Sequence, residues 1–266
     1  MKTLILPLAL LVATTLSAEI VRKSMPYEHD GVKLEGYLVY DDEKTKEGLQ
    51  PGVIVVHEWW GRNEFVNRQA EKLAQEGYVA FALDMYGAGI ETRDANEARE
   101  HAGKFYGSSL MAERAQAGLD AFLSTGFVDA DKVAAVGYCF GGSVVQELAY
   151  SGAPLAGIVS VHGGVSSATP ESAARNQAKF LICHGAADPF VHGEVLDRFL
   201  FSLEENNVDY QFILYQGAKH AFSNEEADEY AELNKLDGVK YHPQAAERSW
   251  KHTKVFLKEV LKAKRG

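Results

Sequence analysis

The sequence is poor in cysteine, carries no excess of positive charge and, beyond its first residues, has no long apolar run. Its 266 residues contain two cysteines, Cys139 and Cys183, which are too few for a disulfide scaffold. The formal net charge of −10 makes nucleic acid and anionic membranes poor partners. With 46% hydrophobic residues and no repeat or long linker, the chain predicts one α/β domain over residues 19–266, and we expect a monomer.

The first 18 residues have the pattern of a signal peptide. They carry one charge at Lys2, an apolar run over residues 4–16, and the small residues Ser17 and Ala18. A buried strand or a retained anchor is the alternative, but the run is short for a membrane span and contains Pro7. We therefore expect cleavage after Ala18 and a periplasmic or secreted protein that does not bind membranes after cleavage.

Strand patterns alternate with helical patterns along most of the remaining chain. Residues 23–40 alternate around Asp30-Gly31, which predicts an antiparallel hairpin, and residues 41–50 predict a charged loop. Strands are then expected at 52–56, 79–83, 133–138, 156–161, 180–183 and 210–215, and helices at 64–75, 96–105, 111–123, 140–150, 191–205 and 243–262. This order predicts an α/β fold with a mainly parallel sheet, helices on both faces, and its chemistry at the carboxyl ends of the strands.

One cysteine lies in a glycine-rich turn between a predicted strand and a predicted helix. The turn has the pattern Gly137-Tyr-Cys139-Phe-Gly141, a cysteine form of the nucleophile elbow, in which the middle residue has strained backbone geometry. A β-carbon at either glycine would collide with the turned backbone, and the amides of the following helix favour a thiolate. The alternative is a buried cysteine beside an ordinary strand-to-helix turn.

A thiol nucleophile needs a base and an acid that orients the base, and two strand ends offer them. The order Cys139, Asp188, His220 is the order of nucleophile, acid and base in α/β-hydrolase folds. Asp188 could instead cap the next helix, and His220 could be structural. A zinc site at His184, Asp188 and His192 is the competing interpretation, but that spacing needs a continuous helix, and a glycine and a proline interrupt it.

The segment after the first parallel strand offers a second group of candidates. The amides of Trp59 and Phe140 are expected to form an oxyanion hole, because in this fold one donor comes from the loop after an early strand. Glu58 could hydrogen-bond the cysteine thiol, or it could be a surface carboxylate. Candidates for an apolar substrate pocket, or for simple core packing, are Trp59, Trp60, Tyr86 and Phe140.

At these residues the chain resembles the dienelactone hydrolase family, a branch of the α/β-hydrolases. The matching motifs are Glu58-Trp-Trp-Gly-Arg-Asn63, Leu83-Asp-Met-Tyr86, Gly137-Tyr-Cys-Phe-Gly-Gly142, Asp188-Pro-Phe190 and His220-Ala-Phe222. The resemblance implies a Cys139, His220, Asp188 triad, with Glu58 as the resting partner of the thiol and an oxyanion hole from the Phe140 and Trp59 amides. It implies no cofactor and no metal.

The family's best-known lactonases bind the substrate carboxylate with two arginines, and this chain lacks arginine at the corresponding positions. The corresponding stretches are Gly87-Ala-Gly-Ile90 and Ser223-Asn-Glu-Glu226, which contain no arginine. Arg62 or Arg93 could substitute, but the acidic run over residues 225–232 argues against a dianionic substrate.

We therefore predict a cysteine hydrolase of carboxylic esters or lactones that acts through a thioester. The alternative from another class is a ligand-binding or thiol redox-sensing protein, which a bridge between Cys139 and Cys183 would support. A peptidase or acyltransferase on the same triad is a second alternative.

Overall fold

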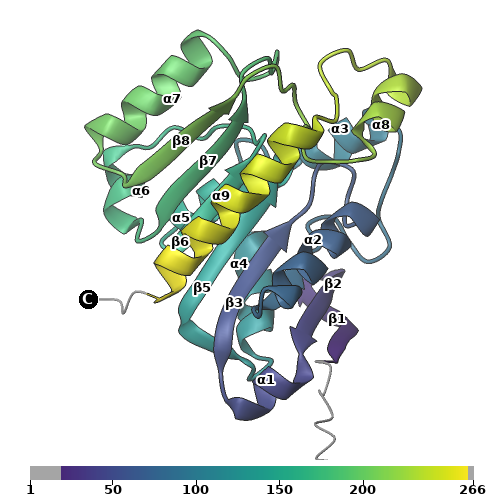
Figure 1. Cartoon of the computed structure of the whole chain (residues 1–266), viewed down its shortest axis with the longest axis vertical. Helices are drawn as coiled ribbons and strands as arrows, with labels where there is room; N and C mark the ends of the chain where they lie inside the picture. The colour runs from purple at the N-terminus through teal and green to yellow at the C-terminus, as the bar shows by residue number, and fades with distance from the viewer. Residues whose placement is uncertain (1–18, 263–266) are drawn as a thin grey trace, which may run out of the picture.

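The computed structural model describes residues 19–262 and shows one eight-stranded sheet with helices on both faces (Figure 1). The strand order is β1-β2-β4-β3-β5-β6-β7-β8, and β3 to β8 pair in parallel with one another, while β1 and β2 form the antiparallel part of the sheet. The strands are β1 (Ile20–His29), β2 (Val32–Asp41), β3 (Gln50–Val56), β4 (Val79–Ala82), β5 (Val128–Tyr138), β6 (Gly157–Val161), β7 (Lys179–Gly185) and β8 (Tyr210–Tyr215). The predicted α/β-hydrolase fold with an N-terminal hairpin is therefore confirmed.

The helices divide between the two faces of the sheet. They are α1 (Asp42–Glu47), α2 (Glu64–Gln75), α3 (Ala95–Gly103), α4 (Leu110–Leu123), α5 (Phe140–Tyr150), α6 (Pro170–Arg175), α7 (Glu194–Glu205), α8 (Ala227–Asn234) and α9 (Pro243–Lys262). Apolar residues of α2 and α9 form one core with one face of the strands, and those of α4, α5 and α7 form another with the opposite face (Figure 1). Within residues 19–262, no helix is both long and apolar enough to cross a membrane.

The hairpin between β1 and β2 turns as its sequence predicts. Asp30 and Gly31 have φ angles of 49° and 74°, which are the left-handed values that a two-residue turn of this twist requires. The second strand then joins β4 in antiparallel pairing.

Residues 41–50 contain a helix where a loop was predicted. Asp41 caps α1 by accepting hydrogen bonds from the amides of Glu43 and Lys44, and Lys46 forms ion pairs within the helix. No side chain of α1 is buried, so the apolar periodicity that predicts a helix from sequence is missing. The helix predicted from residue 191 begins at Glu194, because Gly193 has a φ of 55° and interrupts it. The predicted signal peptide lies outside the described residues.

Candidate active site

Cys139 lies at the junction of β5 and α5 with a φ of 52°. An added β-carbon at Gly137 would overlap the backbone of Gly141, and one at Gly141 would overlap the carbonyl group of Val56. Both glycines of the turn are therefore sterically required, as the elbow pattern predicts. The strained backbone conformation places the cysteine between the end of β5 and the amino end of α5.

Three side chains from three strand ends form a hydrogen-bonded chain. The Nε2 atom of His220 lies 3.1 Å from the sulfur of Cys139, and its Nδ1 atom lies 2.8 Å from Oδ2 of Asp188. Cys139 follows β5, Asp188 follows β7 and His220 follows β8, so the parallel sheet brings together residues that are 81 and 32 positions apart. The arrangement has the order and contacts of a nucleophile, a base and an orienting acid.

Asp188 uses both of its oxygens. Oδ1 accepts hydrogen bonds from the amides of Phe190 and Val191, while Oδ2 pairs with His220. Burial opposes ionisation of this carboxyl, but the hydrogen bonds from His220 and the Phe190 amide outweigh it and lower its pKa. Asp188 does not cap α7, since that helix begins six residues later at Glu194.

The environment of His220 favours its protonated form. Burial by itself would lower its pKa, but the Cys139 sulfur and the Asp188 carboxylate together raise the pKa well above its usual value. A proton that leaves the Cys139 thiol is therefore held readily on the imidazole.

A pocket of about 350 Å³ opens above the sulfur of Cys139. Most of its wall is apolar, with Arg99 as a charged residue on one side. It is lined by Glu58, Trp59, Trp60, Arg99, Tyr106, Cys139, Phe140, Gly164, Phe190, Val191, His220, Ala221, Leu236 and Val239. The amides of Trp59 and Phe140, two residues that line this pocket, donate no hydrogen bond to any group within residues 19–262.

Glu58 lines the pocket, but among residues 19–262 no hydrogen bond joins it to the cysteine thiol. Its Oε2 atom accepts a hydrogen bond of 2.6 Å from Asn224, and its buried Oε1 atom has no partner among the described residues. Burial raises the pKa of Glu58 to about 7. The hydrogen-bond partner of the Cys139 sulfur in this structure is His220, which differs from the expected contact with Glu58.

Two of the predicted substrate contacts lie elsewhere. Tyr86 packs behind the pocket wall against Phe140, and its hydroxyl donates to the carbonyl of Trp59. Arg62 does not line the pocket, because its guanidinium is held by Glu35 and by Asn67.

Arg93, the other substitute considered, also lies outside the pocket. It forms an ion pair with Glu229 and stacks over the ring of Tyr230. Trp60 does line the pocket, where it is buried and stacked on Tyr230.

Three fully or nearly fully buried histidines surround this site. His57 contacts the ring of Phe140, His162 contacts the ring of His220, and Nε2 of His184 donates to the carbonyl of Val191, three residues beyond Asp188. Burial lowers the pKa of all three, so their rings are neutral at pH 7. The Nε2 atom of His184 is occupied by this bond, and Asp188 is occupied by His220, which disfavours the zinc interpretation.

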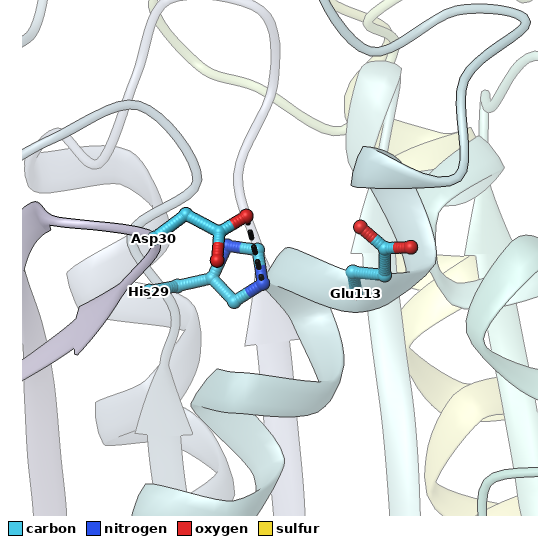
Figure 2. Close-up of side chains that lie close together, drawn as sticks. All are labelled: His29, Asp30 and Glu113. Atoms are coloured by element: carbon cyan, nitrogen blue, oxygen red, sulfur yellow. Dashed lines mark ion pairs between the residues drawn. The ribbon is translucent and has the colours of Figure 1, made fainter.

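A separate group of potential metal ligands lies outside the pocket. His29, Asp30 and Glu113 converge where the β1–β2 turn meets α4 (Figure 2). Arg114 donates a hydrogen bond of 3.1 Å to Nδ1 of His29, so the neutral ring carries its proton on Nε2, the atom that faces the two carboxylates. A protonated nitrogen does not bind a metal ion, and the nearby guanidinium repels one.

Several residues of the site have no signal in the sequence. Arg99 belongs to α3, Tyr106 follows that helix, and Leu236 and Val239 follow α8, so none of them follows a strand. Asn224 could have been suspected only from its place four residues after His220.

Comparisons with known proteins identify the family of the chain. The sequence profile of the Dienelactone hydrolase family matches residues 34–261. A protein of Aquifex aeolicus (strain VF5) that is named for carboxymethylenebutenolidase activity is 26% identical over 240 residues, which cover 89% of this chain and 97% of the relative.

Two solved structures share both the fold and about a third of the sequence. A dienelactone hydrolase-like promiscuous phosphotriesterase from metagenomic libraries is 33% identical, with a TM-score of 0.85 and coverage of 92% of this chain and 99% of the other. A protein called m3DLH is 34% identical, with a TM-score of 0.85 and coverage of 91% and 99%. Because the family profile spans most of the chain and these structures cover more than nine tenths of it, the chain belongs to the dienelactone hydrolase family, as a hydrolase of ester or lactone bonds.

Proposed function

We propose that the protein hydrolyses carboxylic esters or lactones by nucleophilic attack of Cys139, with His220 as base and Asp188 as the acid that orients it. The observation that carries the proposal is the continuous chain of hydrogen bonds, 3.1 Å and 2.8 Å long, from the sulfur at the base of the pocket to the buried carboxylate. The neighbouring Trp59 and Phe140 amides, which are free to donate, support an acyl-transfer reaction.

The reaction follows from the positions of these groups. His220 takes the proton from the Cys139 thiol, and the thiolate attacks the carbonyl carbon of the substrate. The Trp59 and Phe140 amides stabilise the oxyanion, and the C–O bond breaks as His220 returns the proton to the leaving alcohol. Water, deprotonated by His220, then hydrolyses the thioester and releases the carboxylic acid. Asp188 keeps the imidazole oriented and stabilises its positive charge at both stages.

A direct test compares hydrolysis of p-nitrophenyl acetate and of a simple enol lactone by four samples. These are the wild type, the wild type after iodoacetamide, Cys139→Ala and the matched control Cys183→Ala. We expect activity in the wild type and in the Cys183 variant, and none in the other two. Full activity in Cys139→Ala, or no activity in the wild type on a panel of esters and lactones, would refute the proposal.

Phosphotriester hydrolysis is a second candidate activity. It is favoured by the 33% identity to a promiscuous phosphotriesterase and by the apolar pocket wall, which suits uncharged triesters. Release of p-nitrophenol from paraoxon by the wild type but not by Cys139→Ala would establish phosphotriester hydrolysis at this site. Release that persists in Cys139→Ala would show that Cys139 is not the nucleophile for this reaction.

The redox-sensing alternative has less support. Both cysteines are free in the structure, and Cys183 is fully buried, where burial raises its pKa to about 12. A buried thiol of this kind is a poor resolving group for an oxidised Cys139.

We also propose that the protein is exported as a single-domain monomer. The support is the sequence pattern of residues 1–18 and the absence of any linker pattern in the rest of the chain. Intact mass and light scattering of protein isolated from the periplasm or medium test this, and a mass that still contains residues 1–18 would contradict cleavage.

A further inference from the structure

His162, which follows β6, is connected to the segment that carries His220. Its Nε2 atom lies 2.7 Å from the hydroxyl of Ser223, three residues beyond His220. Its ring also lies edge-on to the rings of His220 and Phe222, with centroids 5.6 Å and 5.0 Å away. The ring therefore contacts the 220–223 segment at three of its four residues.

The same turn after β6 contacts the nucleophile. The amide of Cys139 donates to the carbonyl of Val161, and the amide of Gly164 donates to the carbonyl of Cys139. The His162 amide in turn donates to the carbonyl of Cys183 in β7, which fixes the turn to the sheet. Residues 161–164 thus hold the backbone of Cys139 on one side and the His220 segment on the other.

His162 has properties that suit it to support a charged neighbour. It is fully buried, and burial, followed by the nearby His220, lowers its pKa well below the usual value. The titratable groups that face it are His220, Asp188, His184 and Tyr138, whose ring centroid lies 6.0 Å from that of His162. A neutral ring in this place adds no positive charge beside the imidazolium that forms on His220.

Neither residue of the pair contacts the substrate pocket. Ser223 lines a different cavity of about 210 Å³ between α2 and α9, and His162 does not line the pocket above Cys139. Any effect of the pair on the reaction therefore acts through neighbouring residues and not through contact with the substrate, and the neighbour that both residues of the pair adjoin is the segment of His220.

We propose that His162 and Ser223 are positioning residues, which hold the imidazole of His220 within hydrogen-bond distance of the Cys139 sulfur; this role rests on the thiol mechanism proposed above. Loss of the Ser223 hydroxyl frees the segment to move, and small displacements of a catalytic base are costly to the rate.

The test uses Ser223→Ala, with Ser223→Thr as the conservative variant. Ser202→Ala is the matched control, because Ser202 is also half-buried and its hydroxyl also bonds to a distant segment, where it accepts from the amide of Ala168. Two quantities are measured: kcat and KM with p-nitrophenyl acetate, and the rate at which iodoacetamide alkylates Cys139 between pH 5 and 10. Thermal unfolding is recorded for each variant.

In Ser223→Ala we expect kcat to fall about tenfold with little change in KM. We expect the midpoint of its alkylation profile to rise by about one pH unit, since the thiolate loses part of its support from the imidazolium. Ser223→Thr and Ser202→Ala should resemble the wild type in both measurements. His162→Gln, which keeps a polar group near Nε2, should retain more activity than His162→Leu.

Wild-type kcat and an unchanged alkylation profile in Ser223→Ala would overturn the inference. Equal losses in Ser202→Ala would overturn it too, because they would show a general loss of stability. The alkylation profile needs no substrate, so it tests the positioning role even if the protein hydrolyses none of the esters. The activity of Cys139→Ala tests the proposed function separately.

Discussion

The buried carboxyl group of Glu58 gives a sharp prediction about stability and pH. The residue is 2% exposed, and burial raises its pKa from the ordinary 4.5 to about 7, against the opposing effects of the Asn224 amide and His220. The folded state therefore binds more protons than the unfolded state between pH 4.5 and 7. Stability falls as pH rises through this window, because the folded protein must then ionise a carboxyl that has little solvation.

The size of the effect follows from the difference between the two pKa values. Each pKa unit corresponds to about 1.4 kcal/mol, so Glu58 lowers the free energy of unfolding by about 3 kcal/mol between pH 4.5 and pH 7.5. Glu58→Gln keeps an oxygen that can accept from Asn224 but cannot ionise. Its free energy of unfolding, measured by urea denaturation at five pH values, should gain about 3 kcal/mol relative to the wild type across that range.

The control is Glu232→Gln, which removes an exposed carboxyl on α8 and should run parallel to the wild type at every pH. Parallel curves for wild type and Glu58→Gln would refute the reasoning, since they would mean that Glu58 is as ionised in the folded state as in the unfolded state.

Three further changes separate the roles of the site. Asp188→Asn should lower kcat/KM for ester hydrolysis about 10³ to 10⁴-fold with little change in thermal unfolding, because it removes the carboxylate that orients His220; a loss under tenfold would contradict that role. Gly137→Ala should destabilise the fold by about 3 kcal/mol or more, while Gly103→Ala, whose β-carbon meets nothing within 4 Å, should be neutral or stabilising in the same melting experiment. Arg62→Ala should lower the free energy of unfolding by about 1 to 2 kcal/mol, because its hydrogen bonds to Glu35 are lost, and should leave KM unchanged. A large rise in KM would instead indicate that Arg62 contacts the substrate.

The parts of the fold that depend on local pattern could be predicted from the sequence. The turn at Asp30-Gly31 and the glycines on either side of Cys139 are examples, because in each case the backbone conformation restricts which residues fit. Helix α1 could not be predicted in this way, since its support is a capping aspartate and surface ion pairs with no apolar face. Helix α8 was not predicted either, because the acidic residues in this stretch were interpreted only as a negatively charged segment.

The candidate site was predictable where topology alone brings residues together. Cys139, Asp188 and His220 each follow a parallel strand, so their order in the chain predicts a common location. The side-chain partners of Glu58 and Arg62 were not predictable, because Asn224 lies 166 residues from Glu58 and Glu35 lies 27 residues from Arg62. Tertiary packing decides which of several polar groups pairs with a buried carboxylate or guanidinium. A single sequence does not reveal that packing.

The most direct test of the central claim is to trap the acyl-enzyme. The protein is mixed with a slowly hydrolysed p-nitrophenyl ester, quenched in acid during turnover, digested with trypsin and analysed by mass spectrometry. Trypsin separates the two cysteines, since Cys139 lies in the peptide 133–175 and Cys183 in the peptide 180–198. We expect the mass of one acyl group on Cys139, absent after turnover is complete and absent in Cys139→Ala. Turnover with the acyl group on another residue, or with no adduct and full activity in Cys139→Ala, would contradict the account.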